Sequence, residues 1–171
     1  MLYELMGRLP EIDESCYVSE NASIIGEVKL SKNVSIWDFV ALRGDLNSIV
    51  IGENSNVQEN SSVHLDAQFP VKIGKNVTIG HNCVIHGCEI GNNVIVGMGS
   101  IILNGAKIPD NCIIGAGSLV TASTKIETGS VVAGSPAKFL KNLDEKLTAY
   151  ISKNAEEYMS LAKNMKSAKR I

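Results

Sequence analysis

The sequence predicts an all-β fold, a parallel β-helix of hexapeptide repeats that is followed by one C-terminal α-helix. Aliphatic residues recur about every six positions from residue 18 to residue 132, and small or aliphatic residues recur four positions after many of them. From about residue 142 the apolar residues change to helical spacing. An aromatic content of 5% and fifteen glycines suit a core of small aliphatic side chains in repeated turns.

The six-residue period is the main indication of this architecture. An α-helix needs apolar residues at spacings of three and four, and a half-buried strand needs strict alternation, so neither explains it. A unit of six residues holds one short strand and one turn, and three units form one triangular coil. Nineteen units therefore predict about six coils, stacked about 4.8 Å apart. The aliphatic positions are Val18, Ile24, Leu30, Ile36, Leu42, Ile51, Val57, Val63, Ile73, Ile79, Ile85, Ile90, Val96, Ile102, Ile108, Ile114, Val120, Ile126 and Val132.

The segment from about residue 142 to residue 169 predicts an amphipathic helix. Its apolar residues recur at helical spacing among lysines and glutamates, so one face can pack along the β-helix. We interpret the chain as a single domain, with the β-helix over residues 1–137 and the C-terminal helix over residues 138–171. The apolar residues of the helix are Leu143, Leu147, Ile151, Tyr158, Leu161, Ala162 and Met165.

Composition limits the partners that the chain can bind. A formal net charge of −2 gives no basic patch for nucleic acid and no polybasic arm for membranes. The N-terminal residues lack the basic-then-apolar order of a signal peptide, and no apolar run approaches membrane-spanning length. We expect a cytoplasmic protein that acts on a small molecule. The four cysteines form no C-x-x-C pair and are expected to be free thiols: Cys16, Cys83, Cys88 and Cys112.

The three histidines of the chain suggest a metal site. His64 and His86 occupy the same place in units that are one coil apart, so they stack about 5 Å from each other and can reach one ion. His81 falls on the preceding unit, on a different face, and points away from the other two within one chain. A third ligand must then come from a neighbouring subunit, and a homotrimer would form three equivalent sites.

Three neutral histidines and an open coordination position are typical of catalytic zinc. Zinc lowers the pKa of its bound water from 15.7 to about 7, which produces the hydroxide that hydration of carbon dioxide to bicarbonate requires. Imidazole ligands also suit Fe²⁺ or Co²⁺. Counting along the repeat places Gln58 on the face of His81. It places Arg43 in the column below His64 and His86 if residues 42–51 form one unit with three extra residues.

At these residues the chain resembles the γ-class carbonic anhydrase-like proteins, over nearly its whole length. The resemblance implies a left-handed β-helix, and a lyase whose metal is bound by two histidines of one subunit and His81 of the next. Three segments carry the resemblance: A-L-R-G-D-L at 41–46, N-V-Q-E-N-S-S-V-H at 56–64 and T-I-G-H-N-C-V-I-H-G-C at 78–88.

The same resemblance implies roles for four further residues. Gln58 would hold the metal-bound water. Arg43 and Asp45 would pair across the trimer interface, where a role in assembly is an alternative to a role in chemistry. Tyr158, in K-N-A-E-E-Y, resembles a tail tyrosine that reaches the site, and its alternative is a place in the core.

The chain departs from the family pattern at two places. The prototype carries glutamates near the site that are thought to shuttle protons, one directly after the Arg-x-Asp aspartate and one on an acidic loop. Here Leu46 takes the first place, and the loop between residues 63 and 73 holds only Asp66. Without a shuttle, regeneration of hydroxide relies on buffer or solvent. Turnover is then slow, or carbon dioxide is not the substrate.

Two other functions stay open at this point. The segment V-V-A-G-S-P-A-K at 131–138 resembles the closing segment of hexapeptide coenzyme A-dependent acyltransferases, which use a histidine as general base. The third function is a metal-stabilised trimeric scaffold without turnover, which the missing carboxylates favour. A chelator that changes assembly but no hydration rate would separate this scaffold from the enzyme.

Overall fold

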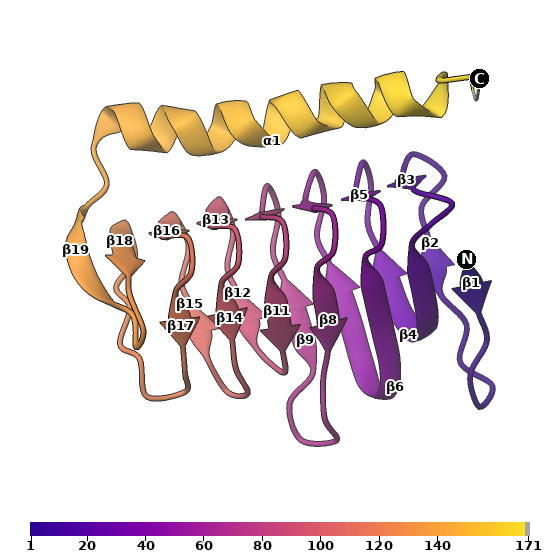
Figure 1. Cartoon of the computed structure of the whole chain (residues 1–171), viewed down its shortest axis with the longest axis horizontal. Coiled ribbons are helices and arrows are strands. Elements are labelled where there is room, and N and C mark those ends of the chain that lie inside the picture. Colours follow the sequence, from indigo (N-terminus) through magenta and orange to yellow (C-terminus); the bar gives the residue numbers. More distant parts are fainter. Residues whose placement is uncertain (170–171) are drawn as a thin grey trace.

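The computed structural model describes residues 1–169 and forms a three-sided β-helix of about seven turns, with one helix laid along it (Figure 1). This confirms the predicted fold class. The number of turns exceeds the expected six coils because the residues before Val18, the first periodic position, form additional strands at the N-terminal end. There β1 (Leu2–Tyr3) and β2 (Glu11–Ile12) both pair with β4 (Ser23–Leu30).

The strands stack in register as three faces of the solenoid. The first face, beneath the helix, is an eight-stranded sheet. The second and third faces form one continuous sheet, because the long strands β4 and β6 (Ala41–Ile51) run along both faces. The first face holds β3 (Tyr17–Val18), β5 (Ser35–Ile36), β7 (Asn56–Val57), β10 (Thr78–Ile79), β13 (Val94–Val96), β16 (Cys112–Ile114), β18 (Ser130–Ala133) and β19 (Lys138–Asn142). The second holds the start of β6, then β8 (Ser62–His64), β11 (Val84–His86), β14 (Ile101–Ile102) and β17 (Leu119–Val120); the third holds the end of β6, then β9 (Val71–Ile73), β12 (Glu89–Ile90) and β15 (Lys107–Ile108).

The periodic aliphatic residues fill the inside of the solenoid, as predicted. Leu42, Val63 and Ile85 are successive partners in the parallel register of the second face, and all three are buried. Val18 and Ile126 are the exceptions: both are only partly buried, towards the two ends of the stack, where fewer neighbouring coils cover them. All four cysteines are free and buried.

Asparagines turn the chain at the corner between the third and first faces. Each has a positive φ near 60°, a conformation that asparagine tolerates far better than other non-glycine residues. Their side chains also form a ladder, each Nδ2 donating to Oδ1 of the next at 3.0–3.1 Å. The residues of this ladder are Asn33, Asn54, Asn76, Asn93 and Asn111.

Phe39 occupies an equivalent position at the corner between the first and second faces. Its φ is 59°, whereas the following coils place Asn60, Asn82, Gly99 and Gly117 at this corner. The Phe39 side chain is 65% exposed, so little packing offsets the strained backbone. We expect Phe39→Asn to raise the free energy of unfolding by about 1 kcal/mol, measured by urea denaturation. Phe39→Ala is the control: an equal gain there would show that side-chain exposure, not backbone strain, is the cause.

The C-terminal helix α1 (Glu145–Lys166) lies along the first face (Figure 1). Asp144 caps its start, where the carboxylate accepts the backbone N–H of Leu147 at 2.8 Å. The helix buries Ile151, Ala155 and Ala162 and contacts β3 and β5. It starts after the expected boundary, because residues 138–142 instead form β19, antiparallel to β18. Residues 170 and 171 of the predicted helical segment lie outside the described residues, and no helix within 1–169 is long and apolar enough to cross a membrane.

Candidate metal centre

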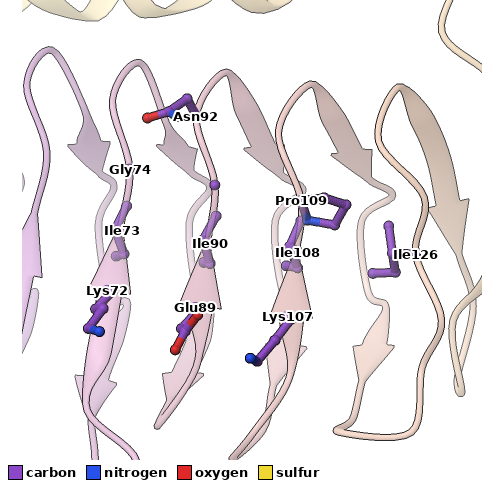
Figure 2. A pocket seen from close by; sticks show the side chains of 11 residues that line it. Lys72, Ile73, Gly74, Glu89, Ile90, Asn92, Lys107, Ile108, Pro109 and Ile126 are labelled. Atoms are coloured by element: carbon purple, nitrogen blue, oxygen red, sulfur yellow. The ribbon is translucent and has the colours of Figure 1, made fainter.

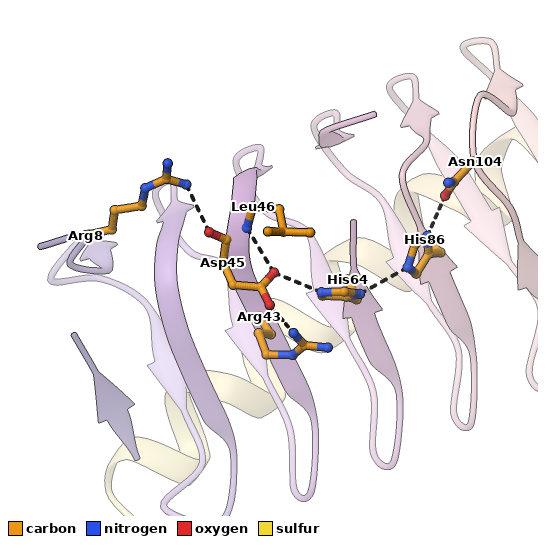
Figure 3. A network of polar contacts seen from close by, with 7 residues as sticks. All are labelled: Arg8, Arg43, Asp45, Leu46, His64, His86 and Asn104. Carbon is orange, nitrogen blue, oxygen red and sulfur yellow. Dashed lines mark hydrogen bonds and ion pairs between the residues drawn. The ribbon is translucent and has the colours of Figure 1, made fainter. Parts of the chain in front are cut away.

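His64 and His86 end the adjacent strands β8 and β11 and are direct partners in the parallel register. Their ring centroids lie 5.0 Å apart, and Nδ1 of His64 is 3.0 Å from Nε2 of His86 (Figure 3). The six-residue period produces this stacking, because three units return the chain to the same face one coil further along.

Nδ1 of His64 and Nε2 of His86, which face each other, are the inner nitrogens of the pair. The other nitrogen of each ring, the outer nitrogen, contacts an oxygen acceptor. Nε2 of His64 lies 2.9 Å from Oδ1 of Asp45, and Nδ1 of His86 contacts Oδ1 of Asn104 (Figure 3). Because these oxygens accept, the outer nitrogens carry the hydrogens in neutral rings. The inner nitrogens then face each other as two lone pairs with no hydrogen between them.

This arrangement fits a divalent metal. Two nitrogens that bind one tetrahedral zinc ion at about 2.0–2.1 Å lie about 3.3 Å apart, slightly more than the 3.0 Å between the two inner nitrogens. In most metal-binding histidines one ring nitrogen binds the metal, and the other donates a hydrogen bond to a carboxylate or carbonyl oxygen. The pair therefore has two nitrogens of fixed orientation that could bind a metal ion.

Asp45 stays ionised beside this pair. Burial raises the pKa of its carboxyl, but the hydrogen bond with His64 and the charge of Arg43 outweigh that effect and hold the pKa below its usual value. Arg43 contacts the Asp45 carboxylate within the same chain. Residues two apart on a strand project from the same side, which explains this contact. The pairing of Arg43 and Asp45 across a subunit interface stays a prediction.

His81 lies apart from the other two histidines, on the turn between β10 and β11. Its Nδ1 is 2.7 Å from Oε2 of Glu59. That oxygen is buried and has no partner with the geometry of a hydrogen bond among residues 1–169, so the contact is a close approach of the two side chains. Among residues 1–169, one chain brings no three histidine, cysteine or acidic side chains together as a metal site. A site that combined His81 with His64 and His86 would need a second chain.

Gln58 lies on the first face, beneath the helix, whereas Tyr158 belongs to the helix α1 itself. The Gln58 side chain is buried and donates to Oδ1 of Asn56 at 3.1 Å, and Asn56 in turn donates to Thr78. Thr78 donates to Asn154 of α1 at 2.7 Å, so a continuous series of hydrogen bonds connects Gln58 to the helix.

The Tyr158 ring packs edge-to-face against Trp37, with centroids 5.7 Å apart. Burial and the charge of Glu59 raise the pKa of Tyr158, so its hydroxyl is neutral at physiological pH. The seven predicted residues thus form two sets: Arg43, Asp45, His64 and His86 on the second face, and Gln58, His81 and Tyr158 at or near the first.

Sequence reasoning missed two side chains that contact the histidines. Glu59 lies one coil before His81, where the backbone N–H of Asn82 donates to its carbonyl, so the same counting could have found it. Asn104 gave no such signal, because its side chain folds back over Gly87 to reach His86.

A surface groove lies elsewhere. It encloses about 540 Å³ on the third face, and Lys72, Glu89 and Lys107 line it along β9, β12 and β15 (Figure 2). None of the predicted site residues lines this groove. The paired histidines therefore define the candidate site better than cavity size does.

The repeating coils and the histidine pair define a hexapeptide-repeat protein with a candidate metal centre. The family model for the bacterial transferase hexapeptide (six repeats) matches residues 70–104 and 87–122. The chain is 45% identical to a probable carbonic anhydrase from Methanocaldococcus jannaschii, over 92% of this chain and 99% of that protein. The chain belongs to the γ-class carbonic anhydrase-like family.

Two further relatives extend the comparison. The mitochondrial gamma carbonic anhydrase 2 of Arabidopsis thaliana is 39% identical over 94% of this chain, which spans 60% of the length of the plant protein. A crystal structure from Bacillus cereus, provisionally named an acetyltransferase, superposes with a TM-score of 0.95 at 33% identity, covering 97% of this chain and 96% of that one. Names from both enzyme classes therefore occur among proteins with this fold.

Proposed function

We propose that the chain is a metal-dependent carbonic anhydrase that hydrates carbon dioxide to bicarbonate at sites shared between the subunits of a homotrimer. His64 and His86 of one subunit and His81 of the next would hold the metal, which is Zn²⁺, with Fe²⁺ or Co²⁺ as alternatives. One observation carries the proposal: the inner nitrogens of His64 and His86 face each other 3.0 Å apart, while their outer nitrogens contact oxygen acceptors.

The bound metal would supply the Lewis acidity that makes water a nucleophile near neutral pH. The chain's own residues orient the reactants. Asp45 accepts from His64 and fixes that ring, and Gln58, whose Nε2 is held by Asn56, keeps Oε1 to accept a hydrogen bond from water. Leu46 provides no proton acceptor beside Asp45, so buffer or solvent would remove the proton, and turnover would depend on buffer concentration.

The second face supports assembly into a trimer. Its outward side chains form a column of small and aliphatic residues, and Val84 and Ile101 are each 40% exposed. Such a column beside His64 and His86 fits a second copy of the chain, which would bring its own His81 to the pair. The column consists of Ala41, Ser62, Val84, Ile101 and Leu119.

Val84→Arg tests the trimer interface. We expect the variant to be a monomer by light scattering and to lose its metal, because a charge in the middle of an apolar contact is not compensated. Lys72→Glu, an exposed change of charge on the third face, is the matched control and is expected to stay trimeric. A trimeric Val84→Arg protein would exclude this face as the interface.

Metal content and stopped-flow hydration of carbon dioxide test the function itself. The protein is purified without chelator, and zinc and anaerobic Fe²⁺ are compared. About one metal ion per chain together with hydration would support the anhydrase. Metal without hydration would favour the scaffold. Absence of metal, together with acetyl transfer from acetyl coenzyme A, would favour the acyltransferase that the Bacillus cereus structure suggests.

A further inference from the structure

The loop between β8 and β9, residues 65–70, is folded back against the solenoid beside His86. Leu65 is fully buried, and Asn47 donates to the carbonyl of Ala67 at 3.1 Å. The Phe69 side chain lies over Gly87 and Gly105, where a Cβ atom would come within 2.9 Å and 3.3 Å of it. The two glycines therefore leave room for the Phe69 side chain, which packs the loop against the solenoid.

Asp66 uses both of its carboxylate oxygens in this arrangement. Oδ1 accepts the backbone N–H groups of Gln68 and Phe69 at 2.9 Å and 3.0 Å. Oδ2 accepts from Nδ2 of Asn104. Asp66, the one acidic residue of the loop, is thus tied to the chain around the histidines and is not free to act as a proton shuttle.

These contacts determine the orientation of the Asn104 amide. A carboxylate only accepts hydrogen bonds, so the NH₂ group of Asn104 must face Asp66 and its Oδ1 must face Nδ1 of His86. An amide oxygen also only accepts, so Nδ1 of His86 carries the hydrogen. In the neutral ring the lone pair is then on Nε2, which faces His64.

We propose that Asp66 is a positioning residue that sets the tautomer of His86 through Asn104. Without an acceptor at Nδ1, a neutral imidazole exchanges between two tautomers, and only one of them presents its lone pair to the proposed metal position. The effect on metal affinity rests on the proposed function, whereas the tautomer itself does not. Outer contacts of this kind change metal affinity about 10–100-fold.

Exchanging the two side chains tests the proposal in the intact 171-residue chain. In Asp66→Asn the new amide can donate to Asn104, which then turns its NH₂ group towards His86. The expected result is the Nε2–H tautomer of His86 in ¹H–¹⁵N spectra of the metal-free protein at mildly alkaline pH. Zinc affinity, measured by competition with a chromophoric chelator, is expected to fall about 10–100-fold.

The double variant Asp66→Asn/Asn104→Asp restores an oxygen acceptor at Nδ1 of His86, because the carboxylate at residue 104 accepts both from the amide at residue 66 and from His86. We expect it to recover the Nδ1–H tautomer and a zinc affinity within about threefold of wild type. Asp110→Asn is the matched control: Asp110 also accepts from a backbone N–H and from the Nδ2 of Asn92, away from the histidines, and its loss should leave both measurements unchanged.

Three outcomes separate the possibilities. Retention of the Nδ1–H tautomer in Asp66→Asn, or no recovery in the double variant, would overturn the positioning role. A wild-type protein that binds no zinc, but whose tautomer switches and recovers as expected, would support the positioning role and overturn the metal centre. Melting temperatures of the variants identify any protein that has lost its fold.

Discussion

We expect His81→Ala to lower the proposed rate of carbon dioxide hydration by about a hundredfold or more, since loss of a ligand would exceed the effect of losing an outer contact. The fold is expected to stay intact because His81 lies on a turn, where its side chain is partly exposed and approaches the side chain of Glu59. The expected result is therefore a folded, metal-poor trimer. Stopped-flow hydration, metal content and the melting temperature measure the three properties separately.

Mixing two inactive variants tests whether the site is shared. One variant carries His81→Ala, and the other carries His64→Ala and His86→Ala. Every trimer that contains both chains has one interface at which an intact His81 meets an intact pair. Random mixing of equal amounts, after dissociation and reassembly, should restore about one quarter of the wild-type sites and of the activity.

Each variant refolded alone is the control and should stay inactive. If the three histidines came together within one chain, neither variant could form a site and mixing would restore nothing. Mass spectrometry of the intact assemblies shows whether mixed trimers have formed. Mixed trimers without recovered activity would contradict the shared site.

The sequence alone predicted the architecture and the position of the histidine pair. A strict period of six requires one short strand and one turn per unit, and three units return the chain to the same face. The stacking of His64 on His86 is a direct consequence of this geometry, and the structure pairs them in register. The separation of His81 from that pair follows from the same counting.

Features outside the period could not be predicted in this way. The strand β19 is set by its antiparallel pairing with β18, not by any repeat, and the N-terminal strands depend on pairing with β4. The contact of Asn104 with His86 depends on a side chain that folds back over a glycine. Periodicity fixes where a backbone position lies, but hydrogen bonds decide where a long polar side chain points.

A column of glycines sets the spacing of the coils at the corner between the third and first faces. A Cβ atom at Gly52 would lie 2.6 Å from the backbone of Gly74, and one at Gly74 would lie 2.6 Å from the carbonyl oxygen of Gly91. These contacts are with backbone, so no flexible side chain can move aside. The close approach of the coils, not a left-handed conformation, requires glycine here, because Gly52, Gly74 and Gly91 have no positive φ.

Gly74→Ala is therefore expected to lower the free energy of unfolding by about 3 kcal/mol, because the added methyl group must push two coils apart. Gly99→Ala is the matched control: its φ is +70°, but a methyl group added there would meet no atom within 4 Å, so only backbone strain of about 1 kcal/mol is expected. Urea denaturation at one fixed protomer concentration measures both, since assembly contributes to stability. Equal losses in the two variants would mean that the coils can separate at little cost, and that the glycine column does not set their spacing.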